Sequence, residues 1–333
     1  MTISFEALEE LLNSILLKTG FPQDKAKTIA SIFANSTLDG YHSHGINRFE
    51  KFLKTISEGH VKIEVEPERE LSLGNFERWD GQLGPGPLSA HFCMNRAIEL
   101  AKKFGMGCVA LKNSNHWMRG GSYGWQATAA GCIGICFTNT EPNMPSWGAK
   151  EANTGNNPFI IAIPRAEGAI VLDISLSQFS YGKMQQLDMD GKDLPFPGGY
   201  DSSGQLTTNP KAIMTSKRLL PTGYWKGSGL SILLDMMATL LSAGRSTAKI
   251  GETEVEYGVS QVFICFDTTQ LNTQNEHESL INEILAFVTN ATPQTAGQLI
   301  HYPGSKTQER RIKYLKEGIP VNETILQRLQ AMV

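Results

Sequence analysis

The order of the predicted helices and strands limits the fold of this chain more than any single motif does. Apolar residues from Phe5 to Leu16 recur at helical spacing, and a second helix is predicted from Pro22 to Ala34. Helices are predicted again at the C-terminus, over 306–317 and 323–332. Short apolar strand candidates occupy the middle of the chain: 108–111, 133–137, 159–163, 169–174 and 260–266. This order predicts an α/β (α+β) fold in which both termini build one helical domain beside a mixed-sheet domain.

We expect the helical domain to comprise residues 1–70 plus 305–333, and the mixed α/β domain to comprise residues 71–304. The nearly all-apolar stretch 230–241 predicts a buried helix. The stretch 185–222, rich in Gly, Pro, Asp and Ser, predicts a long irregular excursion. Only 19% of the residues are charged, against roughly 25% in average soluble domains. This deficit predicts that part of the surface is buried in a subunit interface.

Charge, cysteine content and the N-terminal segment exclude several classes of protein. A net charge of −3 and a pI near 6.2 argue against a nucleic-acid partner, which requires a basic patch. The N-terminus is acidic and amphipathic, unlike a signal peptide, and no apolar run reaches the ~18 residues of a membrane helix. The five cysteines, without a C-x-x-C pair, are expected to be small buried hydrophobes. We therefore expect a cytoplasmic protein with no membrane, nucleic-acid or metal partner.

Two glycine-rich stretches are candidates for nucleotide binding. The first, GPGPLS at 84–89, nearly matches G-x-G-x-x-G, but its prolines remove amide donors that a pyrophosphate needs. A Pro-Gly turn that opens a helix explains it better. The second, WKGSG at 225–229, lies directly before the apolar helix, where approachable amides and the charge of Lys226 favour an anion. An ordinary flexible helix entry is the alternative there.

The segment HSHGINR at 42–48 is the strongest candidate for chemistry. If Ser43 caps a helix, His44 and Arg48 lie four residues apart on one face. Arginine can grip a carboxylate through two parallel N–H bonds, and histidine can transfer a proton near neutral pH. A 2-oxo or 2-hydroxy acid presents both groups side by side. The alternative is a structural His44 and a surface ion pair for Arg48.

A second polar cluster, NSNHWMRGG at 113–121, follows an apolar strand, where active-site loops of α/β enzymes commonly lie.

Six stretches of the sequence resemble the type 2 malate/L-lactate dehydrogenase family. They are YHSHGINRF (41–49), LKNSNHWMRGGSYGWQA (111–127), GCIGICFTNT (131–140), MPSWGAKE (144–151), FSYG (179–182) and GYWKGSGLSILLDM (223–236). The resemblance covers essentially the whole chain. It implies an NAD(P)-dependent oxidoreductase with a non-Rossmann cofactor site, completed near the boundary between the subunits of a homodimer.

The resemblance also implies roles for individual residues. His44 matches the catalytic proton donor, Arg48 the residue that holds the substrate carboxylate, and His116 the second histidine of the substrate pocket. The cofactor contacts match three segments: Ala169, Ile170, Val171, Leu172, Asp173, Ile174 and Ser175; Trp225 and Lys226; and Gly304, Ser305 and Lys306. NADH is the expected cofactor, with NADPH as the alternative.

The substrate expected from the resemblance is a 2,3-dioxo sugar acid. Another member of the same family would act on malate, lactate, sulfolactate, ureidoglycolate or a cyclic imino acid instead. Trp117, Met118 and Trp147 are the side chains expected to decide between these substrates, although tryptophans also serve as packing residues. A non-catalytic binding protein that has kept the fold is the alternative from another class.

Overall fold

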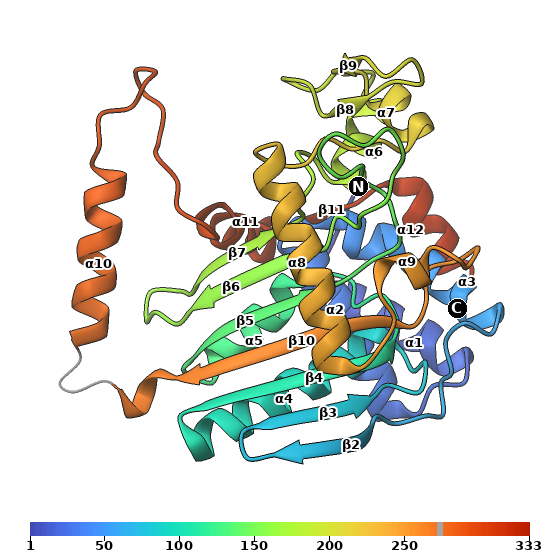
Figure 1. The fold of residues 1–333 in the computed structure, drawn as a ribbon, viewed down its shortest axis with the longest axis vertical. Helices are drawn as coiled ribbons and strands as arrows, with labels where there is room; N and C mark the ends of the chain where they lie inside the picture. Colours follow the sequence, from blue (N-terminus) through green and yellow to red (C-terminus); the bar gives the residue numbers. More distant parts are fainter. Residues whose placement is uncertain (272–275) are drawn as a thin grey trace.

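A seven-stranded mixed sheet forms the centre of the molecule (Figure 1). The structure is a computed structural model that describes residues 1–271 and 276–333. The strand order is β2-β3-β4-β10-β5-β6-β7, with the bounds β2 Glu68–Leu73, β3 Phe76–Asp80, β4 Met106–Ser114, β10 Val259–Asp267, β5 Cys132–Thr138, β6 Phe159–Ile163 and β7 Ile170–Ile174. Only β3 and β4 pair in parallel; the other neighbours in this sheet are antiparallel. This topology is not the parallel doubly wound sheet of a Rossmann fold, so the prediction of a mixed, non-Rossmann sheet is confirmed.

Helices cover both faces of the sheet because its central strands are apolar on both sides. Along β4, Val109 and Leu111 pack toward α4 (Gly86–Phe104) and α5 (Gly121–Ala129). The intervening Ala110 packs on the opposite face, in the cluster that includes α8 (Trp225–Ser242). This alternation follows from the two-residue period of a strand. Four of the five cysteines are fully buried in the first cluster, which confirms their expected packing role.

Helices from both ends of the chain share one apolar core. They are α1 (Phe5–Lys18), α2 (Gln23–Leu38), α3 (Ile46–Ser57), α11 (Ser305–Glu317) and α12 (Glu323–Gln330). Leu12, Phe33 and Phe49 meet Ile319 and Leu326 in this core. Strand β1 (Thr2–Ile3) pairs with β11 (Ile319–Pro320) and ties the two ends together. This shared core agrees with a helical domain built from both termini, and the boundaries 1–70 plus 305–333 stay a prediction.

Two features differ from the expected layout. The predicted excursion 185–222 is partly regular: it holds the end of α6 (Tyr181–Met189), a small ladder of β8 (Gly199–Tyr200) and β9 (Leu206–Thr207), and α7 (Pro210–Ser216). The prediction of a buried 230–241 helix is wrong for the single chain. One side of α8 packs on the sheet, whereas Leu233 and Leu240 on the other side are 57% and 75% exposed.

Helix α10 (Glu276–Thr289) projects away from the rest of the chain (Figure 1). It has no buried residue, and its Phe287 is 85% exposed. The remaining short elements are η1 (His42–His44), α9 (Thr247–Ile250) and η2 (Thr268–Gln270). In the part of the chain that the structure describes, no helix is both long and apolar enough to cross a membrane.

Candidate functional site

His44 lies in a short 3-10 turn rather than in the helix that carries Arg48. The turn spans His42–His44, and α3 begins at Ile46 with Gly45 as its N-cap residue. The prediction that Ser43 caps this helix, with His44 and Arg48 on one helical face, is therefore wrong. The hydroxyl of Thr37 on α2 accepts a hydrogen bond from the Ile46 N–H at 2.9 Å, so a neighbouring helix supplies the cap.

His44 and His116 stack against each other, although 72 residues separate them in the sequence. Their ring centroids lie 5.7 Å apart at an interplanar angle of 12°. His116 follows β4, and its Nδ1 accepts a hydrogen bond from the Met118 N–H at 3.0 Å. That contact places the proton of a neutral His116 on Nε2, which is left as a hydrogen-bond donor. Met118 adopts a left-handed φ of 67°, a strained conformation that shapes this loop around His116.

Both histidines are neutral at pH 7. Burial is the main cause that lowers the pKa of His44 to about 4; the cations of Arg48 and Arg119 lower it further, while Asp173 opposes them. Burial, with Arg48, His44 and Lys51, also holds the pKa of His116 well below its ordinary value. The half-buried site therefore carries positive charge, which disfavours protonation of either histidine and favours an anionic ligand.

Two carboxylates that sequence reasoning missed accompany Arg48. Glu141 and Glu256 are the negative charges that support the protonated form of Arg48 against its burial, which lowers its pKa. Burial also raises the pKa of Glu256, and the Glu141 N–H donates to its Oε2 at 3.0 Å. Neither residue stood in a motif, and no spacing in the sequence links them to Arg48. Within the described residues Arg48 makes no ion pair shorter than 4.0 Å, so its predicted alternative role in a surface ion pair finds no partner there.

The proposed cofactor segments 169–175 and 304–306 lie side by side. Strand β7 is the edge of the sheet, and a Cβ on Gly304 would lie 3.0 Å from the backbone nitrogen of Val171. The Gln308 side chain also donates to the Ala169 carbonyl at 3.0 Å. Val171 therefore turns its backbone N–H and C=O away from β6, and Asp173, two residues on, has the same orientation. A free strand edge meets the N-terminus of α11 at this point.

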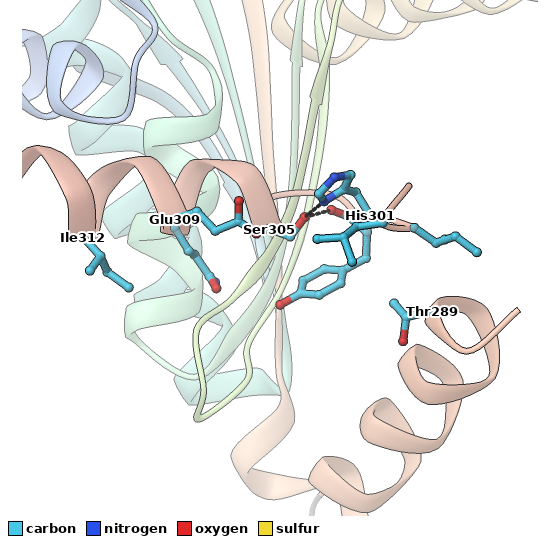
Figure 2. Close-up of a pocket in the computed structure, with 9 residues that line it drawn as sticks. Thr289, His301, Ser305, Glu309 and Ile312 are labelled. Carbon is cyan, nitrogen blue, oxygen red and sulfur yellow. Dashed lines mark hydrogen bonds between the residues drawn. The ribbon is translucent and has the colours of Figure 1, made fainter. Parts of the chain in front are cut away.

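A cavity of about 320 Å³ opens beside the start of α11 (Figure 2). Its lining includes Ser305, whose hydroxyl hydrogen-bonds the Tyr302 carbonyl, and Glu309 one turn further along α11. The side of the cavity opposite α11 is formed by Thr289 at the end of α10 (Figure 2). The Ser305 and Thr307 N–H groups of the first turn of α11 donate to the carbonyls of Tyr302 and Gly304. The dipole of this 13-residue helix favours an anion at its N-terminus.

Trp225 and Lys226 lie near the other end of β7. The Thr222 N–H donates to the carbonyl of Leu176 at 2.8 Å, which joins the entry of α8 to the chain that leaves β7. Helix α8 begins at Trp225, so the glycines of WKGSG lie inside its first turn rather than before it. Of the three proposed cofactor segments, the first is thus the edge strand β7 itself, the second lies at a helix entry hydrogen-bonded to the chain after β7, and the third packs against β7 at Gly304. Their side chains are exposed at Trp225, Lys226 and Lys306.

Two of the expected specificity residues do not face a pocket. Trp117 is 2% exposed and packs edge-on against Phe263 in the sheet core, and Met118 belongs to the helical core. The expectation that they decide between substrates is therefore wrong, because both side chains are used for packing. Trp147 is exposed and lies edge-on to Tyr224 at 5.3 Å. Within residues 1–271 and 276–333, no group of three metal-binding side chains is found.

Comparisons with known proteins agree with this geometry. The family model of malate/L-lactate dehydrogenase matches residues 3–330. The 2,3-diketo-L-gulonate reductase of Citrobacter koseri is 44% identical over 333 residues, with all of both chains covered. The crystal structure of malate dehydrogenase from Entamoeba histolytica has a TM-score of 0.94 at 25% identity, covering 100% of this chain and 97% of that one. Sulfolactate dehydrogenase from Methanocaldococcus jannaschii has a TM-score of 0.88 at 27% identity, covering 100% and 96%.

Proposed function

The chain belongs to the malate/L-lactate dehydrogenase family, and on that premise we propose that it reduces 2,3-diketo-L-gulonate to 3-dehydro-L-gulonate with NADH. It is a nicotinamide-dependent oxidoreductase that acts on a CH–OH group. The observation that carries the substrate is the full-length identity of 43–44% to curated reductases of that diketo acid. The stacked histidines and the half-buried Arg48 support the chemistry, since they offer a proton, a hydrogen-bond donor and a carboxylate partner together.

Three side chains divide the work at the substrate. Arg48 binds the substrate carboxylate, because a guanidinium matches a carboxylate with two parallel hydrogen bonds. His116 donates from Nε2 to the substrate, since its Nδ1 is already used by Met118. His44 delivers the proton to the oxygen on C2. Held in this arrangement, the substrate's carbonyl is oriented before the reaction begins, which lowers the barrier by positioning.

His44 can act as the proton donor despite its low pKa because the substrate carries a negative charge. In the free protein the cation of Arg48 helps to lower the pKa of His44 to about 4. A substrate carboxylate bound to Arg48 neutralises that cation. The pKa of His44 therefore rises when the substrate binds. His44 takes up a proton in the complex and then delivers this proton to the substrate. Proton uptake is thereby linked to substrate binding.

The residues present fit a nicotinamide dinucleotide. Strand β7 is an edge strand of the sheet, and α11 begins beside it, where the helix dipole favours a phosphate. When bound, the reduced nicotinamide supplies a hydride. A preference for NADH over NADPH is supported by the cavity beside α11, since its lining holds Glu309 and neither lysine nor arginine. A 2′-phosphate would be repelled by that carboxylate, whereas a ribose hydroxyl can donate to it.

A homodimer is supported by two apolar surfaces that the single chain leaves uncovered. On α8 the outer side carries Leu233, Met236 and Leu240, and on α10 the exposed apolar residues include Ile284 and Phe287. Monomeric proteins rarely expose apolar surface of this extent, so a second copy is the natural cover. Both helices border proposed cofactor segments, since α8 begins at 225–226 and α10 ends at the cavity beside 304–306.

The loss of reduced-nicotinamide absorbance tests the proposal. The purified protein would be mixed with 2,3-diketo-L-gulonate and either NADH or NADPH, and pyruvate and oxaloacetate would serve as controls. We expect rapid NADH oxidation with the diketo acid alone and slower oxidation of NADPH. Faster turnover of a simple 2-oxo acid would overturn the substrate while leaving the reaction class intact. Turnover of none of these acids would contradict the enzyme itself.

A further inference from the structure

Arg119 is the most deeply buried cation near the site, and the proposed function gives it no role. Its side chain is 3% exposed, and it lies between His116 and the start of α5. Its guanidinium forms an ion pair with Asp39, the residue that ends α2. The other oxygen of Asp39 accepts from Arg311 on α11 at 2.8 Å. Two arginines from distant parts of the chain therefore share one buried carboxylate.

Arg119 also faces a second carboxylate, that of Asp173 on β7. The distance from Arg119 Nε to Asp173 Oδ2 is 3.6 Å, and the same oxygen accepts from the Gly121 N–H at 2.9 Å. Position 121 is closed to a side chain, because a Cβ there would lie 2.7 Å from Asp173 Oδ2 and 3.2 Å from Arg119 Nε. Within the described chain, the buried Nε of Arg119 has no hydrogen-bond partner. The guanidinium thus lies between two carboxylates and bonds directly to one of them.

A third contact connects Arg119 to the segment that carries His44. The guanidinium lies 3.9 Å from the centre of the Tyr41 ring, within cation–π range. The carbonyl of Tyr41 accepts from the His44 N–H at 3.0 Å, and its hydroxyl lies 3.3 Å from Thr307 Oγ1 on α11. A displacement of the Arg119 guanidinium would therefore displace Tyr41 and the turn that holds His44.

We propose that Arg119 is a positioning residue that sets the spacing between His44, His116 and the edge strand β7. The identity of these segments as substrate and cofactor sites rests on the proposed function. Arg119 contacts the turn of His44 through Tyr41, follows His116 by three residues, and meets β7 at Asp173. A rigid planar cation suits this task, since it can contact two carboxylates and one aromatic face at once. It acts through these neighbours and has no role in the transfer itself.

The alternative is that Arg119 only stabilises the fold through its ion pair with Asp39. A substitution of Arg311 distinguishes these two roles. Arg311 shares the same carboxylate of Asp39, but its side chain is 41% exposed and its other contact is Asn35 on α2. It contacts neither Tyr41 nor Asp173 in the described structure. Arg311→Met therefore removes an equal charge from the same partner without touching the link to β7. It is the matched control for Arg119→Met.

The test compares Arg119→Met, Arg119→Lys and Arg311→Met with the wild-type protein. Three functional readouts are used: kcat and KM with the diketo acid, the Kd for NADH by fluorescence, and the pKa of His44 by NMR of labelled histidine. The unfolding temperature of each variant is measured beside them. In Arg119→Met we expect kcat to fall tenfold or more, the Kd for NADH to rise several-fold, and the pKa of His44 to rise. The pKa rises because a cation is lost and Asp173 keeps its charge, with Arg48 as the remaining cation near His44.

Arg119→Lys keeps the charge but cannot reach both carboxylates, so we expect values between those of the wild type and Arg119→Met. Arg311→Met should change kcat, KM and the Kd for NADH less than twofold and leave the pKa of His44 unchanged. Equal losses in Arg119→Met and Arg311→Met, in step with their unfolding temperatures and with an unmoved His44 pKa, would overturn the proposal. If Arg119→Met does not fold, Arg119→Lys carries the comparison. NADH binding and the His44 titration need no substrate, so they decide this proposal even if the proposed substrate is wrong.

Discussion

Replacing Arg48 by methionine should lower the affinity for the substrate and raise the pKa of His44. Arg48 is assigned to the substrate carboxylate, and its cation is also, after burial, the largest influence that lowers the pKa of His44. Methionine has a similar length and no charge. The variant should therefore bind the substrate less well and at the same time hold a proton on His44 more readily. A residue with only a packing role would produce neither change.

The magnitudes follow from the charges. A shift of the His44 pKa from 6.5 to about 4 opposes protonation by about 3 kcal/mol and leaves on the order of one histidine in a thousand protonated at pH 7. One pH unit in a pKa corresponds to about 1.4 kcal/mol, and after burial the largest cause of the low pKa of His44 is the cation of Arg48. Removing it should raise the pKa of His44 by about one pH unit, with burial keeping it below 6.5. Losing a charged hydrogen-bond partner should cost about 1.5–3 kcal/mol, or roughly 10- to 150-fold in kcat/KM.

Two measurements check this pair of effects. The His44 resonance would be followed from pH 4 to 8 in protein labelled at histidine, with His44→Gln used for assignment. Steady-state kinetics with the diketo acid would give kcat/KM. Lys51→Met is the matched control, because Lys51 is another cation beside Arg48 but is not among the groups that shift the pKa of His44. An unmoved or lowered pKa of His44 in Arg48→Met would refute the electrostatic argument, and an unchanged kcat/KM would refute the carboxylate role.

Three further predictions concern the proton donor, pH and the subunit interface. His44→Ala should lose about 10²- to 10⁴-fold in kcat while the fluorescence-measured Kd for NADH stays within twofold; loss of cofactor binding in a folded variant would argue against a proton donor. For the wild type, kcat/KM for reduction should fall by up to tenfold per pH unit from pH 5 to 8, since the pKa of His44 in the free protein is about 4 and its protonated form is consumed; a flat profile would exclude His44 as the donor. Leu240→Arg on α8 should convert the proposed dimer to monomers in light scattering, whereas Met189→Arg, at an exposed position on α6, should leave it intact; a dimer in both would place the interface elsewhere.

The strands of the sheet could be predicted because they are short apolar runs bounded by glycine and proline. The expected strand 159–163 coincides with β6, and the expected 133–137 lies within β5 by one residue at each end. The cofactor segments were placed by resemblance alone, and their proximity depends on a topology that makes β7 an edge. No periodicity in the sequence reveals which strand ends the sheet.

The details of the site depend on contacts between distant residues, which explains why sequence reasoning missed them. Thr37 caps α3 from another helix, so Ser43, a good N-cap residue by type, is not needed for that task. Arg119 meets Asp39 across 80 residues and Asp173 across 54, and neither pair forms a recognisable spacing. The carboxylate of Asp235, inside the apolar helix α8, accepts from Asn139 at 2.8 Å and from the Thr247 N–H at 2.9 Å. Its position in α8 gave no indication of either residue.

The apolar helix shows a different limit of sequence reasoning. Leu230–Leu241 is nearly all apolar, which predicts burial but not the identity of what buries it. In the single chain the sheet covers one side, and Leu233 and Leu240 remain exposed on the other. An apolar side that the fold leaves open is consistent with the low fraction of charged residues. Both observations support the proposed dimer.

The most direct test of the proposed reaction is the fate of the hydride. The protein would be given 2,3-diketo-L-gulonate and NADH that carries two deuterium atoms at C4 of the nicotinamide, and the product would be examined by NMR and mass spectrometry. We predict one deuterium per product molecule, bonded to C2, with the proton of the new hydroxyl taken from solvent. Deuterium at C3, or a product without deuterium, would contradict the assignment of Arg48 and His44 to the carboxylate and the neighbouring carbonyl.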